Sequence, residues 1–219
     1  MSARHPEVPS QRYVTESAAR VRLAAGSVSD GSEEEWRRAL DVNVTGTLNL
    51  GPGPGSYWWF SATDGWRQLD DGIGNANGPA VLDLDGEPTL VFADTHAAKI
   101  YAYPYDGATG SVGGREVFAD TTALNGLPDG ACVDGSGGLW SCLFGAGKIV
   151  RYSPQVEAVI DAGADLVTDV TFGGADLGDM FFVSISTMGG FESDAPNAGR
   201  LMKVEGTGYR GRAEPRFRL

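Results

Sequence analysis

The stretch Leu139-Trp140-Ser141-Cys142-Leu143-Phe144-Gly145-Ala146-Gly147-Lys148-Ile149-Val150-Arg151-Tyr152 decides the fold class of this chain. It contains a short apolar strand, a glycine-bearing loop and a second strand that opens on a basic residue. The same pattern occurs once before this stretch and once after it. The strand pairs of the three copies are residues 90–93 with 99–103, 139–142 with 148–152, and 180–183 with 200–204.

Successive copies begin about 40 to 50 residues apart, which is the period expected when a four-stranded blade of a β-propeller is the repeating unit. Tyr57-Trp58-Trp59-Phe60 and Thr63-Asp64-Gly65-Trp66 read as strand, turn and strand, and add part of an earlier blade. The 32 glycines suit many tight turns and argue against a helical bundle. We therefore predict an all-β fold over residues 56–219, a partial β-propeller of about 3.5 to 4 blades.

Residues 1–55 do not follow the repeat, and we predict an N-terminal arm with one amphipathic helix at about residues 33–48. Ser32 is placed to cap this helix, and Glu35 supplies the partner residue of a capping box. The apolar stripe, which repeats every fourth residue, consists of Trp36, Leu40, Val44 and Leu48. The run Gly51-Pro52-Gly53-Pro54-Gly55 cannot continue a helix, so we expect a boundary there.

Residues 34–47 resemble the segment that precedes the active site of short-chain dehydrogenases, where an asparagine matching Asn43 supports the catalytic residues. The chain has neither a glycine-rich dinucleotide turn after a strand nor a Tyr-x-x-x-Lys pair. We therefore interpret this resemblance as chance or as a fused fragment, and expect no oxidoreductase activity.

The balance of 17 basic and 29 acidic residues gives a net charge of −12. Such a surface repels nucleic acid and anionic membranes, so we expect neither as a partner. No stretch approaches the roughly 20 apolar residues that span a bilayer, and the N-terminus lacks a basic-then-apolar leader. We therefore expect a cytoplasmic protein, unless a segment was removed. Two cysteines and two histidines make a Cys/His zinc site improbable, and we expect both thiols to be reduced and buried.

Two short motifs stand at the entrances of neighbouring blades, each directly before an apolar strand. They are Gly74-Asn75-Ala76-Asn77-Gly78-Pro79 and Leu127-Pro128-Asp129-Gly130-Ala131-Cys132-Val133-Asp134. Loops that enter the innermost strand of a blade face the central channel, so we expect Asn77 and Asp129 to point at one place. A carboxylate and an amide carbonyl suit calcium or another divalent cation. The alternative is that Asn77 and Asp129 only build turns, because both residue types are common before glycine.

The sequence Asp94-Thr95-His96 contains residue types found in hydrolytic triads. No Gly-x-Ser-x-Gly elbow accompanies it, so we expect a loop that connects strands.

An ordered set of short motifs follows the first of these entrances. It consists of Asn77-Gly78, Phe92-Ala93-Asp94-Thr95, Tyr105-Asp106 with Thr109-Gly110, Val117-Phe118-Ala119-Asp120, Pro128-Asp129-Gly130, Val133-Asp134, Gly138-Leu139-Trp140, Lys148-Ile149-Val150-Arg151-Tyr152-Ser153-Pro154 and Thr171-Phe172-Gly173-Gly174. In this order and spacing the motifs resemble the senescence-marker-protein/gluconolactonase/regucalcin family over about residues 56–208.

The resemblance implies a six-bladed propeller that holds one divalent metal ion (Ca²⁺, Zn²⁺ or Mn²⁺) and hydrolyses a small, sugar-type lactone. It implies that Asn77 and Asp129 are metal ligands, and that Asp129 also takes a proton from the attacking water. The family's third ligand, a Glu of the first blade, and its sugar-binding Arg-Phe-Asn-Asp-like loop have no counterpart in this sequence. Waters would then complete the coordination, and Asn75 is a further candidate oxygen.

The departures from the family leave a second function open. An incomplete, catalytically inactive propeller could act as a metal- or partner-binding module. Its open end would expose a strand edge, which invites self-association.

Overall fold

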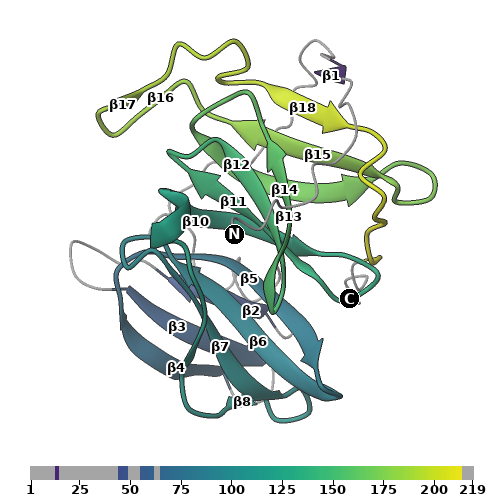
Figure 1. The fold of residues 1–219 in the computed structure, drawn as a ribbon. Helices are drawn as coiled ribbons and strands as arrows, with labels where there is room; N and C mark the ends of the chain where they lie inside the picture. The colour runs from purple at the N-terminus through teal and green to yellow at the C-terminus, as the bar shows by residue number, and fades with distance from the viewer. Residues whose placement is uncertain (1–12, 15–43, 49–54, 62–64, 214–219) are drawn as a thin grey trace, which may run out of the picture.

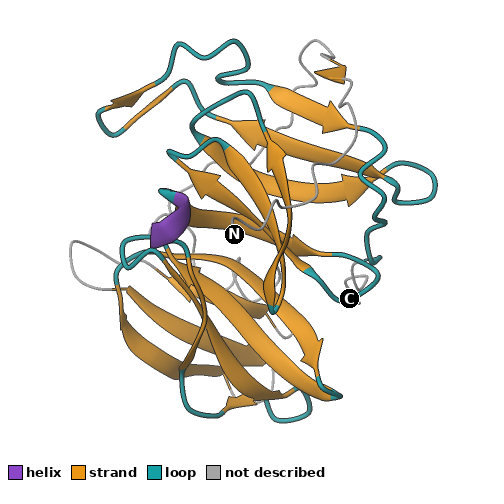
Figure 2. Ribbon diagram, in the orientation of Figure 1, coloured by secondary structure: helices purple, strands orange, loops and turns teal. Residues whose placement is uncertain are grey.

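The computed structural model describes residues 13–14, 44–48, 55–61 and 65–213, and these form four antiparallel sheets of three to five strands and one separate two-stranded hairpin (Figure 1). Strands make up nearly all of the regular structure (Figure 2). Within the described ranges the one helix is a single 3₁₀ turn, Thr122–Leu124. The partial all-β propeller predicted from the repeat is therefore confirmed. No helix in this part of the chain is long and apolar enough to cross a membrane.

The first two sheets are built from consecutive strands. The first has the order β2–β3–β4, with β2 at Val44–Leu48, β3 at Gly55–Ser61 and β4 at Gly65–Ile73. The second contains β5 at Ala76–Leu84, β6 at Glu87–Asp94, β7 at Lys99–Asp106, β8 at Ser111–Val112 and β9 at Glu116–Asp120. Strands β8 and β9 both pair with β7. Asp85 and Gly86, with φ of 55° and 86°, link β5 to β6 in the positive-φ geometry that suits the twist of a two-residue hairpin.

The third and fourth sheets repeat this plan. The third has the order β10–β11–β12–β13, with β10 at Leu127–Val133, β11 at Leu139–Phe144, β12 at Lys148–Ser153 and β13 at Gln155–Asp161. The fourth contains β14 at Val167–Gly173, β15 at Asp179–Ser184 and β18 at Leu201–Val204. Between β15 and β18 the chain forms a small hairpin of β16 (Thr187–Met188) and β17 (Phe191–Glu192). The three strand pairs of the sequence repeat are β6/β7, β11/β12 and β15/β18.

The outer strand of the fourth sheet comes from the opposite end of the chain. Strand β1, Tyr13–Val14, pairs antiparallel with β18, with Tyr13 opposite Val204. Residues at the start of the sequence therefore complete a sheet built from residues 167–204. The repeat gave no sign of this pairing.

The predicted helix is wrong at its C-terminal end. Val44–Leu48 is strand β2, paired with β3 from Val44 opposite Phe60 to Leu48 opposite Ser56. The apolar spacing of four residues is ambiguous, because positions i and i+4 share a face in a helix and also in a strand. Val44, Thr45 and Thr47 are β-branched and Gly46 lies between them, which disfavours a helix once a partner strand is present. The remainder of the predicted helix, residues 33–43, lies outside the described residues.

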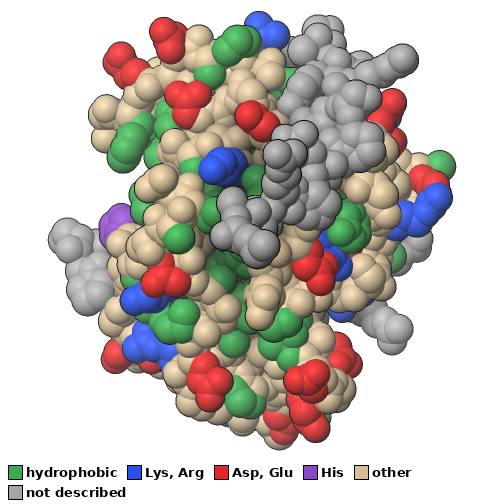
Figure 3. Space-filling model, viewed as in Figure 1, with side chains coloured by type: hydrophobic (Ala, Val, Ile, Leu, Met, Phe, Trp, Pro, Cys, Tyr) green, Lys and Arg blue, Asp and Glu red, His purple; other side chains and the backbone are tan. Residues whose placement is uncertain are grey.

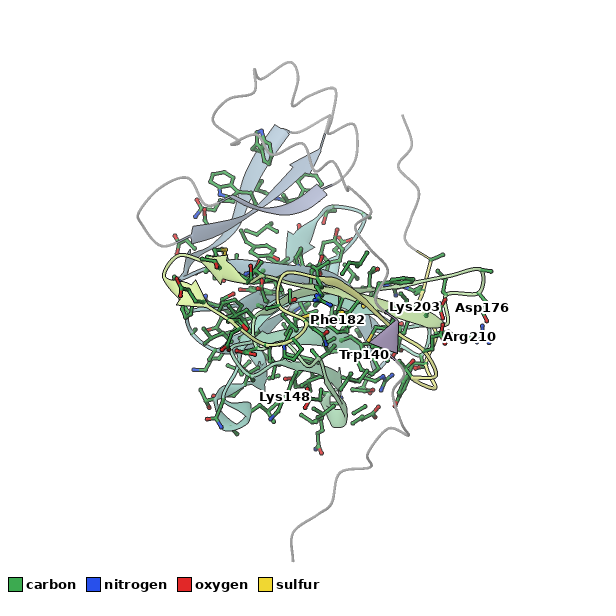
Figure 4. The ribbon with its side chains drawn as sticks, turned by 90° about the horizontal axis from the view of Figure 1, so that it is seen from above. Trp140, Lys148, Asp176, Phe182, Lys203 and Arg210 are labelled. Atoms are coloured by element: carbon green, nitrogen blue, oxygen red, sulfur yellow. The ribbon has the colours of Figure 1, made fainter. Side chains whose placement is uncertain are left out.

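The core consists of apolar layers between successive sheets. Alternate residues of one strand supply two layers: on β6, Leu90 and Phe92 face the first sheet while Val91 faces the third. On β11, Trp140 and Cys142 pack against the fourth sheet, where Phe182 is also buried (Figure 4). Burial on both faces explains why these strands read as unbroken apolar runs. Truncation of Trp140, which is fully buried, to Ala should cost about 3 to 5 kcal/mol.

Candidate functional site

The innermost strands of the second, third and fourth sheets each contain a β-bulge near their first residues. The ladder register shifts between Asn77 and Ala80 on β5, between Pro128 and Ala131 on β10, and between Val167 and Asp169 on β14. Strand β10 packs between β5 and β14. Bulges redirect side chains and are common next to functional sites. The three inner strands therefore present irregular backbone at neighbouring positions.

Two glycines allow these bulges to approach one another. A Cβ on Gly78 would lie 2.5 Å from the carbonyl oxygen of Asp129, and Gly78 has a φ of +50°. A Cβ on Gly130 would overlap Asp169 Oδ1 and lie 2.6 Å from the carbonyl oxygen of Thr168. Glycine after Asn77 and after Asp129 is therefore required by contact between blades, in addition to any turn preference. The predicted residues Asn77 and Asp129 are brought to adjacent bulges.

The side chain of Asn77 is held by a threonine of its own sheet. Asn77 Nδ2 donates a hydrogen bond of 2.9 Å to Thr95 Oγ1, and the Thr95 hydroxyl donates one of 2.8 Å to the carbonyl of Pro128. Pro128 directly precedes Asp129, so this pair of bonds links the two bulges. Asn75, the further candidate ligand, lies just before β5. Its backbone N–H donates to Asp94 Oδ1, and its backbone carbonyl accepts from the Thr95 N–H.

The Asp129 carboxyl lies in an environment that disfavours its charge. Burial and, to a lesser extent, the negative charge of Asp169 raise its pKa to about 6, against the opposing effect of the Gly130 N–H. Burial also raises the pKa of Asp169, against a hydrogen bond from the Val170 N–H, although the Asp169 side chain is the more exposed of the two. Two carboxyl groups on adjacent sheets thus lie close enough for the charge of Asp169 to act on Asp129, and no basic side chain lowers the pKa of either.

Both cysteines lie near this pair and both are free thiols. Burial, followed by the charges of Asp169 and Asp129, raises the pKa of Cys142 well above its usual value, so its thiol stays protonated and unreactive. Cys132 is only half-buried, which corrects the expectation that both thiols are buried.

The arrangement offers oxygen atoms as ligands. Asn77 and Asp129, the predicted ligands, stand at adjacent bulges, and Asp169 at the next bulge adds a second carboxylate that the sequence analysis missed. Asp169 could have been found by aligning the inner strands of the copies, since it stands at the bulge of the third one as Asp129 stands at the bulge of the second. Among the residues with described positions, no group of three or more His, Cys, Asp or Glu side chains surrounds one point.

The fold and this centre define a class of protein: a partial β-propeller whose inner strands carry polar side chains at neighbouring bulges. The chain belongs to the SMP-30/Gluconolactonase/LRE-like family, whose region matches residues 42–186. The matched region begins before the Gly/Pro run and includes β2, in agreement with the pairing of β2 and β3.

Several relatives carry names that describe an activity or a ligand. A pentonolactonase (XacC) from Haloferax volcanii is 31% identical over 206 residues, which are 84% of this chain and 70% of that protein. Regucalcin from Danio rerio is 32% identical over 127 residues, covering 55% of this chain and 42% of that protein.

Solved structures show the same fold. A calcium-binding protein, regucalcin, from Agrobacterium tumefaciens is 28% identical with a TM-score of 0.65, and the match covers 77% of this chain and 58% of that one. A luciferin-regenerating enzyme is 26% identical with a TM-score of 0.69 and coverage of 78% and 58%. The chain thus spans little more than half the length of these solved relatives.

Proposed function

We propose that this chain is a metal-dependent hydrolase of a small, sugar-type lactone, in which Asn77 and Asp129 hold a divalent cation and Asp129 is the general base. The observation that carries the proposal is the placement of these two residues on adjacent bulges, with the pKa of Asp129 raised to about 6. Without a bound cation, a carboxyl group of this pKa is mostly ionised at neutral pH and accepts a proton more readily than an ordinary aspartate. The family and the pentonolactonase relative support the choice of substrate class.

The donor set fits a hard cation. One amide oxygen and two carboxylates, from Asn77, Asp129 and Asp169, suit Ca²⁺ or Mn²⁺ better than Zn²⁺, which favours nitrogen and sulfur ligands. Asp169 supplies the third protein oxygen in this proposal, and waters complete the coordination. The cation would also relieve the repulsion between the two carboxylates.

The chemistry is ester hydrolysis. A divalent cation bound at this centre would polarise the lactone carbonyl. Asp129 takes a proton from the attacking water, whose oxygen forms the new bond to the carbonyl carbon. The ring C–O bond then breaks, and the departing ring oxygen takes the proton back from Asp129, which leaves an open-chain hydroxy acid. Asp129 would serve both as a ligand of the cation and as the base, since a carboxylate has two oxygen atoms.

The test is hydrolysis of δ-gluconolactone with Ca²⁺, Zn²⁺ or Mn²⁺, followed by proton release in weak buffer. Asp129→Ala should reduce kcat/KM by at least about a hundredfold, since it removes a base and a ligand together. Asp176→Ala is the matched control, because Asp176 is exposed and paired with Arg210 far from the bulges. Equal rates for Asp129→Ala and the wild type would remove the enzymatic proposal.

A second candidate function is a catalytically inactive propeller that binds a metal or a partner. It is favoured by the four sheets among the described residues, against six blades in a full propeller of this family. Exposed Met188 and Phe191 on the β16–β17 hairpin offer apolar surface for self-association. A clean monomer by light scattering would count against this assembly.

Acidic side chains are spread over the visible face (Figure 3), which supports a small neutral ligand over nucleic acid.

A further inference from the structure

Thr95 is a buried polar residue, 8% exposed, at the turn that follows β6. Its hydroxyl contacts two residues that belong to different sheets: the Asn77 amide of its own sheet and the Pro128 carbonyl of the next. We propose that Thr95 is a positioning residue that fixes which atom of the Asn77 amide faces the cation and holds the backbone at Asp129. This inference rests on the proposed function.

The direction of the two hydrogen bonds fixes the orientation of the amide. A threonine hydroxyl has one proton to donate, and a carbonyl oxygen can only accept. Because Thr95 gives its proton to Pro128, it can only accept from Asn77, so the group that faces it must be the Asn77 NH₂. Asn77 Oδ1 is therefore turned away from Thr95. A single hydroxyl decides that Asn77 offers an oxygen, instead of a repelling N–H pair, to a cation.

The same hydroxyl acts on the second ligand through the backbone. Pro128 has no N–H, so its carbonyl is the one backbone hydrogen-bonding group that it brings to the bulge. Thr95 binds this carbonyl from the neighbouring sheet, at the residue just before Asp129. Loss of the hydroxyl would free the bulge of β10 at the position where Asp129 leaves the ladder.

The turn that carries Thr95 is itself held firmly. The Thr95 N–H donates to the carbonyl of Asn75 at 2.8 Å, and its carbonyl accepts from the Ala98 N–H at 3.2 Å. The carboxylate of Asp94 accepts from the N–H groups of Gly74, Asn75 and Ala97. The motif that suggested a triad thus forms a rigid support. A well-fixed support is what a positioning residue needs, since its own movement would be passed on to the ligands.

The test compares three variants by isothermal titration of Ca²⁺ and Mn²⁺ into the metal-free, full-length protein. Thr95→Val keeps the shape and removes the hydroxyl, and should weaken cation binding about 10- to 100-fold, as lost support of a ligand typically does. Thr95→Ser keeps the hydroxyl and should remain within about threefold of the wild type. Thr207→Val is the matched control: Thr207 is also buried, and its hydroxyl bonds the backbone of Tyr209, after the fourth sheet and away from the bulges. It should lower the Tm without changing cation affinity.

Thr95→Val with wild-type affinity, or Thr207→Val with an equal loss of affinity, would overturn the role of Thr95. Failure of the proposed function gives a different result: Asn77→Ala and Asp129→Ala would then bind Ca²⁺ as the wild type does. If Thr95→Val does not fold, hydrogen exchange of the Asn77 side-chain NH₂ in the wild-type protein decides. Slow exchange supports the bond to Thr95, and exchange as fast as that of an exposed asparagine contradicts it.

Discussion

An aspartate stands near each end of strand β10, and the two environments shift the pKa of the carboxyl group in opposite directions. Asp134, directly after the strand, is almost fully buried, and burial alone would raise its pKa; bonds from Arg151, Ser136, Gly138 and Trp140 nevertheless lower that pKa to about 2. Asp129, at the bulge, is less buried, yet its pKa is raised to about 6.

The difference lies in the partners. Arg151 donates to Asp134 from Nε at 2.6 Å and from Nη2 at 3.1 Å, so two charge-assisted bonds stabilise the ionised form. Asp129 has one backbone donor, Gly130, and a like charge on Asp169. At the C-terminal end of β10, Asp134 thus forms a fully hydrogen-bonded ion pair with Arg151 at the turn to β11. Near the N-terminal end, the Asp129 carboxylate has few hydrogen-bond donors. Such unsatisfied acids are typical of functional sites.

The largest expected effect on stability comes from removing the buried ion pair between Arg151 and Asp134. Arg151→Met should lower the free energy of unfolding at pH 7 by about 3 to 5 kcal/mol, because it leaves the Asp134 charge buried and unpaired. Urea denaturation measures the change. Because the folded-state pKa of Asp134 is depressed, the ion pair stabilises the protein above about pH 4 and is lost as the pH falls through about 2. The deficit of the variant should therefore shrink in acid.

Arg210→Met is the control for this prediction. Arg210 pairs with Asp176 at the edge of the molecule, away from Trp140 and Phe182 (Figure 4), and the two side chains are 65% and 61% exposed. Its unfolding curve should stay close to that of the wild type, because solvent screens an exposed pair. If both arginine variants lose the same stability, burial is not what distinguishes Asp134.

The second prediction concerns the contact between bulges. Gly130→Ala should cost about 1 to 3 kcal/mol, because its Cβ would overlap Asp169 and force the β10 and β14 bulges apart. Gly135→Ala, at the other end of β10, is the matched control: its Cβ would meet nothing closer than 3.4 Å. Thermal unfolding of the two variants measures the difference. A Gly130→Ala protein as stable as Gly135→Ala would contradict the close approach of the two bulges.

A third prediction tests whether the charge of Asp129 destabilises the fold. The folded-state pKa of Asp129 lies above its usual value of 3.8, so its charge destabilises the metal-free fold as the pH rises from about 4 to about 6. Asp129→Asn should therefore stabilise the metal-free protein at pH 7.5 by roughly 1 kcal/mol and change little at pH 4. Chemical denaturation after chelation of divalent ions measures this effect. Ca²⁺ should then raise the stability of the wild type but not of the variant, and a variant that is less stable than the wild type at pH 7.5 would contradict the argument.

The smallest effect is expected from the neighbouring acid. Asp169→Asn removes a charge that raises the pKa of Asp129, so this pKa should move toward its usual value. It should remain above that value, since burial is the larger cause. A carboxyl ¹³C titration of the metal-free protein by NMR measures the change. An unchanged Asp129 titration would show that the two carboxyl groups do not interact.

The repeat predicted the strand pairs β6/β7, β11/β12 and β15/β18, because blade strands are buried on both faces and are separated by loops rich in turn residues. It also predicted that Asn77 and Asp129 lie on neighbouring inner strands. The helix over 44–48 was wrong because a spacing of four residues does not distinguish a helix from a strand, and pairing with β3 decided the outcome.

The sequence analysis missed Asp169 and Thr95 for a different reason. Whether Asp169 faces Asp129 depends on two bulges that meet across a blade interface, and local spacing does not specify this contact. The role of Thr95 depends on the direction of two hydrogen bonds, one of which ends on a backbone carbonyl 33 residues away. A sequence shows which groups can donate a hydrogen bond, but the fold determines which groups accept it.

The pairing of β1 with β18 has a consequence for how the protein is made. Tyr13 leaves the ribosome well before Val204, its partner in the ladder. Strand β1 must therefore wait without its partner until β18 has been synthesised, and a contact of such long range closes slowly. The fourth sheet should become resistant to protease later during translation than the first three sheets.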